Sequence, residues 1–242
     1  MNSKKLKVVV LTHGGANRLL EVLSAIETVE IAGVFIETAT KPNRSLKEKL
    51  KRSVRYDGYW TTAKKFSAIL FGGETAMDLL KKTNADLGIL YGTNIIKESV
   101  FSIPRLGSIN LHQGLAPIYR GGPTVFWELF NGEKEIGITI HFVASKVDTG
   151  DIILQKTLPL EYDFSRYELD YENFLRDFRA SLKEPSVQLI AEAVSLIADG
   201  REQRIKQDTT IGKRYRLPTK TEKDALLRVL KERRHLDGIP LN

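Results

Sequence analysis

The sequence predicts an α/β fold: a Rossmann-like, mostly parallel sheet with helices on both faces, followed by a helical C-terminal extension. Residues 6–12 form a continuous apolar and β-branched run, as in a strand buried on both faces of a parallel sheet. A glycine-containing turn (HGGAN) and a helical pattern (LLEVLSAIE) follow directly, which is the usual opening of a doubly wound domain. After residue 160, apolar side chains recur at helical spacing.

Further short apolar runs predict strands at 31–38, 87–91, 109–112, 138–143 and 152–160. Helices are predicted at 74–83, at 219–236 with Thr219 and Glu222 as a capping box, and from Pro123 to Asn131-Gly132. The apolar pattern of 171–197 is interrupted at Pro185, so it predicts one broken helix or two short ones. We therefore divide the chain into a core, residues 1–160, and a mainly helical extension, residues 161–242, that completes the domain.

Composition excludes several classes of protein. The chain is 42% hydrophobic, which supplies a core, yet no apolar run is long enough to span a bilayer, so we expect no membrane role. The absence of cysteine excludes disulfides, thiolate nucleophiles and cysteine-based metal sites. The N-terminal apolar run is short and has no cleavage pattern after it. We therefore expect no signal peptide and a cytoplasmic protein.

The net charge of +7 favours anionic partners such as phosphates or nucleotides. Basic residues gather in two stretches, 41–55 and 201–234. These stretches are either ordinary solvated faces or a face for an anionic ligand. Neither has the interleaved aromatic residues that stack on bases, so nucleic acid is not an expected partner.

The pair Asn110 and His112 is the first chemical signal. Two residues apart on a strand, their side chains project to the same face, at the strand end where open α/β sheets bind ligands. Asparagine can donate a hydrogen bond to a developing oxyanion, and histidine can do so when protonated or can exchange a proton. Asp148, in a turn between two predicted strands, can reach the same edge, and a carboxylate raises the pKa of a neighbouring histidine. Alone, an Asn-x-His pair is more often structural.

The surrounding signature resembles that of the folate-dependent formyltransferase family. Shared with it are the Asn-x-His pair, an LxPxYRG stretch from Leu115 to Gly121, the apolar helix ending at Asn131-Gly132, the GITIH strand (137–141) and the Asp-x-Gly of 148–150 followed by IILQ. Their order and spacing hold over residues 108–155, and the resemblance extends more weakly to about residue 6.

The resemblance implies that Asn110, His112 and Asp148 are the catalytic residues of a transferase. The formyl group would pass from 10-formyltetrahydrofolate to a primary amine through a tetrahedral intermediate, without a metal. Asn110 and protonated His112 would stabilise the oxyanion, and Asp148 would hold His112 in its cationic form.

Two loops would cradle the pterin of the folate. The corresponding residues are Tyr91, Gly92, Thr93, Asn94, Ile95 and Ile96 in the first loop. The second loop is Val143 to Asp148, with Val143 and Val147 as candidates. The first loop, GTNIIK, departs from the usual family pattern. Because the family's pterin contacts are mostly made by the backbone, folate use is still expected.

The N-terminal turn resembles the phosphate loop of glycinamide ribonucleotide transformylase. Gly14, Gly15 and Asn17 are therefore candidates for substrate binding, since N–H groups at a helix start suit a phosphate. The alternative is a plain turn, with His13 as a turn residue. Arg120 and Gly121 are further candidates for substrate binding, and His141 is interpreted as a supporting residue. Phe126 and Trp127 either pack in the core or line the acceptor pocket.

Several acceptors fit the resemblance. We favour a nucleotide-linked amino sugar or another small phosphorylated amine, because sugar N-formyltransferases vary most after the core, where this chain has RYRLPTK and a helix. Glycinamide ribonucleotide is the alternative. Methionyl-tRNA is less expected because those enzymes add a β-barrel, whereas residues after 160 read as helical. Hydrolysis of the donor, a non-catalytic folate- or nucleotide-binding relative, and a homodimer through the last helix stay open. A dinucleotide oxidoreductase would need a third glycine after Gly15.

Overall fold

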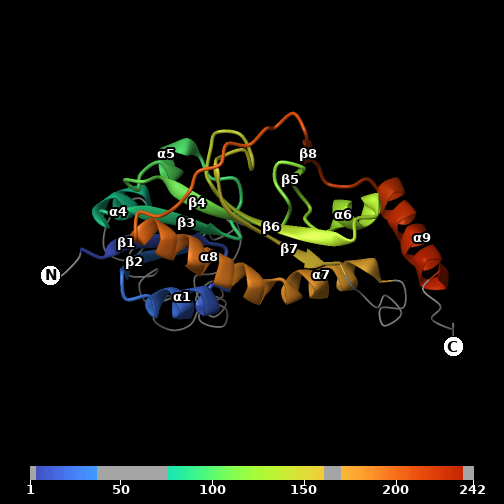
Figure 1. Cartoon of the computed structure of the whole chain (residues 1–242), viewed down its shortest axis with the longest axis horizontal. Helices are drawn as coiled ribbons and strands as arrows, with labels where there is room; N and C mark the ends of the chain where they lie inside the picture. The colour runs from blue at the N-terminus through green and yellow to red at the C-terminus, as the bar shows by residue number, and fades with distance from the viewer. Residues whose placement is uncertain (1–3, 37–75, 161–169, 237–242) are drawn as a thin grey trace, which may run out of the picture.

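The computed structural model describes residues 4–36, 76–160 and 170–236, so the basic stretch 41–55 lies outside the described residues. A six-stranded sheet in the order β2-β1-β3-β4-β6-β7 runs through the centre of the molecule (Figure 1). Its strands are β1 (Leu6–Thr12), β2 (Val29–Ile36), β3 (Leu87–Tyr91), β4 (Ser108–His112), β6 (Glu135–Phe142) and β7 (Ile152–Pro159). Strands β2, β1, β3 and β4 are parallel, and β6 and β7 run antiparallel to their neighbours. The predicted α/β sheet is confirmed.

Helices cover both faces of this sheet, which explains the continuous apolar run of β1. Val8 and Val10 belong to one core cluster, together with residues of α1 (Asn17–Ser24) and α8 (Lys183–Ala198). Val9 and Leu11 point the other way, into a cluster with Leu80 of α4 (Ala76–Lys82) and Val100 of α5 (Glu98–Phe101). Alternate side chains of one strand are thus buried on opposite faces.

A second core lies where β6 extends beyond the parallel strands. It is formed by side chains of α6 (Phe126–Asn131), α7 (Tyr171–Ser181) and α9 (Lys220–Leu236), at the C-terminal end of the molecule in Figure 1. Leu226 and Leu230 of α9 are buried there, so part of the apolar stripe considered for a dimer packs within the chain. The capping box of α9 is confirmed: Glu222 N donates to Thr219 Oγ1 at 3.3 Å, and Thr219 N donates to Glu222 Oε2 at 2.7 Å.

Several predicted boundaries were wrong. Strand β2 begins at Val29, two residues before the predicted start. Helix α6 begins at Phe126 and not at Pro123, because Val125 before it has a left-handed backbone (φ +74°) that cannot continue a helix. The break between α7 and α8 falls at Leu182, and Pro185 lies in the first turn of α8, where its missing N–H costs nothing.

A two-stranded parallel sheet was not predicted. Strand β5 (Tyr119–Gly121) pairs with β8 (Lys213–Tyr215), which lies in residues 201–217, a segment that crosses the molecule from α8 to α9 (Figure 1). We call residues 201–217 the crossing segment. In the described ranges, no helix is long and apolar enough to cross a membrane.

Candidate active site

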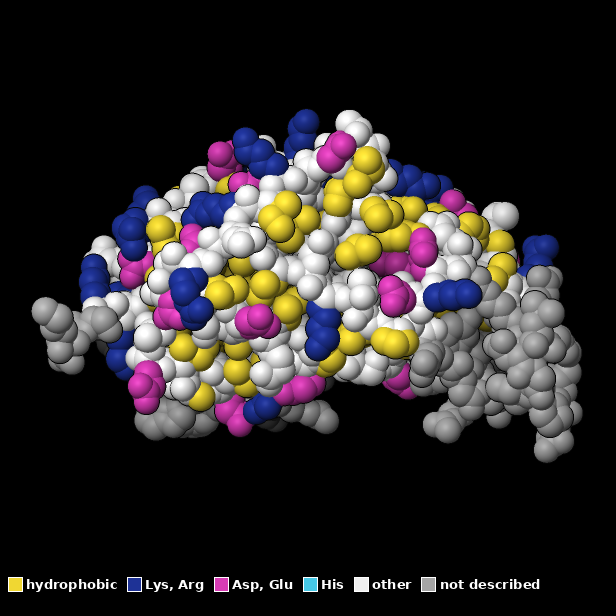
Figure 2. Space-filling model, in the orientation of Figure 1, with side chains coloured by type: hydrophobic (Ala, Val, Ile, Leu, Met, Phe, Trp, Pro, Cys, Tyr) yellow, Lys and Arg dark blue, Asp and Glu magenta, His cyan; other side chains and the backbone are white. Residues whose placement is uncertain are grey.

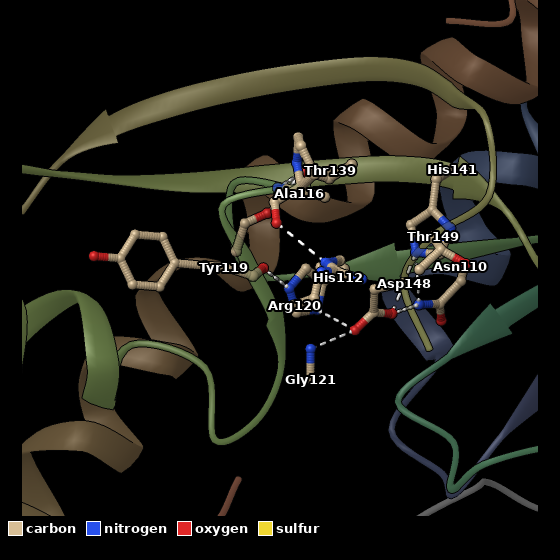
Figure 3. Close-up of polar contacts among 12 residues, drawn as sticks. Asn110, His112, Ala116, Tyr119, Arg120, Gly121, Thr139, His141, Asp148 and Thr149 are labelled. Atoms are coloured by element: carbon tan, nitrogen blue, oxygen red, sulfur yellow. Dashed lines mark hydrogen bonds and ion pairs between the residues drawn. The ribbon is translucent and has the colours of Figure 1, made fainter. Parts of the chain in front are cut away.

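Four predicted or supporting residues, Asn110, His112, His141 and Asp148, meet at the ends of β4 and β6. Asn110 and His112 lie on β4, and Asn110 is the register partner of His141 on the antiparallel strand β6. Asp148 comes from the loop between β6 and β7, where its backbone has a left-handed conformation (φ +52°). The positive φ is unusual for a residue other than glycine and turns the carboxylate back toward the two strands (Figure 3).

The carboxylate of Asp148 joins the site together. Its Oδ2 atom lies 3.5 Å from His112 Nδ1 and accepts a 2.8 Å hydrogen bond from Gly121 N. Its Oδ1 atom lies 3.4 Å from His141 Nε2. Burial alone would raise the pKa of Asp148, but the contact with His141, the two imidazoles and the Gly121 N–H outweigh it and lower the pKa to about 2. Asp148 is therefore ionised at neutral pH.

The surroundings of His112 determine which of its two ring nitrogens carries hydrogen in the neutral form. Its Nε2 atom lies 2.7 Å from the carbonyl oxygen of Tyr119, which can only accept, so Nε2 carries hydrogen and Nδ1 faces Asp148. Burial lowers the pKa of His112, against the opposing effects of Asp148 and of the Tyr119 carbonyl. Asp148 raises the pKa of His112 as expected, but burial of the 6% exposed imidazole outweighs this effect, so the pKa is lowered.

The side-chain amide of Asn110 contacts both Asp148 and His141. Its Nδ2 atom donates to Asp148 Oδ1 at 3.3 Å and lies 3.3 Å from His141 Nε2. His141 Nδ1 is 2.7 Å from the Phe142 carbonyl, so this nitrogen carries the proton and Nε2 can accept from Asn110. Both amide contacts are at the long end of the hydrogen-bond range, so the Asn110 amide can exchange either for a closer oxygen atom.

A cleft of about 950 Å³ opens over these side chains. It is lined by Asn110, His112, His141 and Asp148, by Gly92 to Ile96 of the first predicted folate loop, and by Val143 to Val147 of the second. Tyr91 itself is buried and does not line the cleft. The structure thus brings both predicted loops and the three predicted catalytic residues to one cavity, of a volume that suits a ligand of folate size.

The sequence did not predict the opposite wall of the cleft. It consists of Arg214, Tyr215, Arg216 and Leu217, from the crossing segment. Tyr215 stacks on Tyr119 with ring centroids 5.1 Å apart, and the Trp127 indole donates to the Arg216 carbonyl at 2.9 Å. Trp127 and Phe126 are buried and support this wall from behind, which favours the core-packing interpretation of both.

Arg120 holds the crossing segment in place. Its guanidinium donates to the carbonyls of Pro117, Thr209 and Gly212 at 3.1–3.2 Å and does not line the cleft. Gly121, also predicted to bind substrate, does line it. A Cβ atom on Gly121 would lie 2.6 Å from the Tyr215 carbonyl, so glycine permits the close pairing of β5 with β8.

The N-terminal turn lies near the cleft without lining it. His13 N donates to the Gly92 carbonyl at 3.3 Å, which ties the turn to the first folate loop. Gly14, Gly15 and Asn17 are not among the residues that line the cleft, and Asn17 is the first residue of α1. Their role in phosphate binding stays a prediction.

Known proteins resemble the chain in sequence and in fold. A methionyl-tRNA formyltransferase of Parabacteroides distasonis is 34% identical over 135 residues, which are 56% of this chain and 39% of that enzyme. For the same enzyme of Pelotomaculum thermopropionicum, identity is 36% over 152 residues, 62% of this chain and 44% of that enzyme. The chain spans about two fifths of the length of these curated relatives.

Solved structures with a similar fold match over most of the chain. The formyltransferase PseJ from Anoxybacillus kamchatkensis, solved with a UDP-linked formamido sugar and tetrahydrofolate, has a TM-score of 0.54 and 23% identity, covering 87% of this chain and 86% of that one. Glycinamide ribonucleotide transformylase 1 from Symbiobacterium toebii has a TM-score of 0.57 and 22% identity, covering 84% and 95%. At these identities the likeness concerns the fold alone. The family model described as Formyl transferase matches residues 6–177, and the chain therefore belongs to the formyl transferase family.

Proposed function

We propose that this protein transfers a formyl group from 10-formyltetrahydrofolate to the primary amine of a small phosphorylated acceptor, in the first place a nucleotide-linked amino sugar. The observation that carries the proposal is the position of Asp148. One carboxylate contacts His112, Asn110, His141 and the Gly121 N–H, at the floor of a cleft that both predicted folate loops line. A site with this geometry can stabilise an oxyanion and move a proton.

His112 acts first as a base. The neutral imidazole, favoured by burial, has its lone pair on Nδ1 beside Asp148. The acceptor amine attacks the formyl carbon, a C–N bond forms, and the carbonyl electrons move to oxygen. The amine proton passes to Nδ1, so that His112 becomes a cation paired with the ionised Asp148.

Collapse of the intermediate returns this proton. Asn110 exchanges one of its 3.3 Å contacts for the oxyanion, which it stabilises together with the imidazolium. The oxyanion electrons then re-form the carbonyl, the bond from carbon to the folate nitrogen breaks, and that nitrogen takes the proton from His112. The products are tetrahydrofolate and a formamide.

The charge of the cleft supports a phosphorylated acceptor. Three cationic side chains line the cleft, Lys146, Arg214 and Arg216, against one carboxylate, Asp148. Arg216 is held by Glu222 at 2.9 Å. Lys146 and Arg214 have no ion-pair partner within the part of the chain that the structure describes. Arg214 lies beside Gly121, close to Asp148, so it is our candidate for the acceptor phosphate.

The test is an absorbance assay of folate release from 10-formyl-5,8-dideazafolate across a panel of amines. The panel contains nucleotide-linked amino sugars, glycinamide ribonucleotide, methionyl-tRNA and a control without acceptor. Release with an amino sugar alone supports the proposal. Release with glycinamide ribonucleotide alone, or with methionyl-tRNA alone, would identify that compound as the acceptor in place of an amino sugar. Release without acceptor would make the protein a hydrolase, and binding of folate without any release would favour a non-catalytic relative. Absence of folate binding would overturn the proposal.

A further inference from the structure

The crossing segment also contacts the loop that carries Asp148. Ile205 and Ile152 exchange two backbone hydrogen bonds, Ile152 N to Ile205 O at 2.8 Å and Ile205 N to Ile152 O at 2.9 Å. Two residues further along the segment, the side-chain amide of Gln207 donates to the Gly150 carbonyl at 2.6 Å. Gln207 therefore binds the backbone two residues after the catalytic carboxylate.

Only one side of the Gln207 amide is satisfied. Its Nε2 atom faces a carbonyl, which can only accept, so the orientation of the amide is fixed. Its Oε1 atom is buried, and within the described residues it has no hydrogen-bond partner. A buried oxygen atom without a partner costs free energy. We therefore attribute the presence of the amide to the hydrogen bond that it donates to Gly150.

The backbone of Gly150 is a fixed point at the base of the Asp148 loop. A Cβ atom on Gly150 would lie 1.8 Å from the Phe142 carbonyl, so glycine permits this close approach. Phe142 N donates to the Asp151 carbonyl at 2.9 Å, and these contacts close the loop. Within the closed loop, Asp148 has a φ of +52°, a conformation that its surroundings must maintain in a residue other than glycine. The hydrogen bond from Gln207 acts at this base, next to the strained position.

The crossing segment reaches Asp148 from a second side. Gly121 of β5 donates its N–H to Asp148 Oδ2 at 2.8 Å, and it is the register partner of Tyr215 on β8. The segment thus borders Asp148 twice, at the carboxylate through Gly121 and at the backbone through Gly150. A shift of the Asp148 turn would lengthen the hydrogen bond from Gly121, so the Gly121 N–H reports the position of the carboxylate.

We propose that Gln207 is a positioning residue: through its hydrogen bond to Gly150, it holds the turn that keeps the Asp148 carboxylate against His112 and Gly121. The part of this inference that concerns catalysis rests on the proposed function. Gln207 is not among the residues that line the cleft, so it acts on the reaction through Asp148. The imidazolium of His112 forms beside Asp148 Oδ2 during formyl transfer, and a turn held at Gly150 keeps this carboxylate in place.

The first measurement does not require turnover. Amide hydrogen exchange is compared by NMR in the wild type, in Gln207→Leu, which lacks the donor, and in Gln203→Leu, at an exposed position of the same segment. We expect Gln207→Leu to lower the protection of the Gly121 amide about ten-fold and Gln203→Leu to leave it unchanged. The amides of Ile205 and Lys213 donate to carbonyls outside the segment, and their unchanged protection would show that the segment is still in place. Unchanged protection of Gly121 in Gln207→Leu, or an equal loss at all three amides, would overturn the inference.

The second measurement separates kcat from KM, with the acceptor that the release assay identifies. We expect the kcat of Gln207→Leu to fall about ten-fold, because a displaced Asp148 stabilises the imidazolium less well. The KM of the acceptor should stay constant, because Arg120 still holds the opposite wall of the cleft. Gln203→Leu should follow the wild type, and an unchanged kcat in Gln207→Leu would contradict the inference. If the wild type transfers no formyl group while the protection of Gly121 still falls in Gln207→Leu, the proposed function fails and the positioning of Asp148 by Gln207 stands.

Discussion

The two walls of the cleft differ in how their residues are held. The wall formed by β4, β6 and the Asp148 loop consists of side chains that contact one another, and His112 and His141 are almost completely buried. The crossing segment forms the other wall, which is held by its backbone carbonyls through Arg120 and Trp127, while Leu217 is 78% exposed. The side chains of the first wall thus hold one another in a fixed geometry, whereas the second wall exposes Arg214 and Leu217 to a variable ligand.

Removal of the Asp148 charge should have the largest effect. Asp148→Asn keeps the shape but removes the carboxylate that pairs with protonated His112, so we expect kcat to fall about a thousand-fold with folate affinity nearly unchanged. Asp151→Asn, in the same loop, is the matched control. Steady-state kinetics and folate titration measure both. If Asp148→Asn turned over nearly as fast as the wild type, the charge of Asp148 would not be needed for the reaction, and the first wall would not be the chemical one.

The first wall was largely predictable from the sequence, and the second was not. Asn110 and His112 share a face because of their spacing on one strand, a local relation that periodicity reveals. Asp148 was assigned by its place in a family signature. The pairing of β5 with β8 instead depends on residues 119–121 meeting residues 213–215 in space, and neither three-residue strand has an apolar pattern of its own. The same holds for Glu128, whose burial follows from the packing of α6 with α7 and α9 and not from any motif.

The buried carboxyl group of Glu128, which is 2% exposed, should reduce stability when it is charged. The raised pKa of Glu128, about 7, exceeds the ordinary value of 4.5. Below pH 4.5 the carboxyl group is protonated in the folded and unfolded states, and stability is complete. Stability falls as the pH rises through 7, by about 3 kcal/mol in total. We therefore expect Glu128→Gln to be about 3 kcal/mol more stable than the wild type at pH 8 and equal to it near pH 4.

Urea unfolding at the two pH values measures this difference. Glu135→Gln, at an exposed position of β6, is the matched control and should not gain stability at pH 8. If Glu128→Gln were no more stable than the wild type at pH 8, the buried carboxylate would not destabilise the folded protein.

The anchoring of the second wall should depend on Arg120. Arg120→Ala removes three hydrogen bonds to the carbonyls of Pro117, Thr209 and Gly212, and we expect a loss of about 2 kcal/mol of unfolding free energy. Hydrogen exchange of residues 209–215 should become faster, while exchange in β4 and β6 stays as in the wild type. Arg201→Ala, at an exposed pair with Asp199, is the control. Equal exchange in Arg120→Ala and the wild type would show that other contacts hold this wall.

The side chains of the second wall should select the acceptor. Arg214→Ala should raise the KM of a phosphorylated acceptor about ten-fold and leave kcat and the KM of the formyl donor unchanged, because we propose that Arg214 binds the acceptor phosphate and not the reacting atoms. Lys206→Ala removes the same charge from an exposed position of the crossing segment that does not line the cleft. An equal rise of KM in both variants would indicate general attraction by the net charge of the protein.

The smallest effect should come from the end of the crossing segment, where α9 begins. Thr219→Ala removes the hydroxyl that accepts from Glu222 N, and we expect a loss of about 1 kcal/mol of unfolding free energy. Thr221 is the exposed second residue of α9. Thr221→Ala should leave the unfolding free energy unchanged, because alanine is favoured within a helix. Glu222 also holds Arg216 at 2.9 Å, next to the cleft. If the cap only stabilises α9, the KM of the acceptor stays constant in Thr219→Ala. If this KM rises, the cap also positions Arg216, and the second wall is set by the capping box as well as by Arg120.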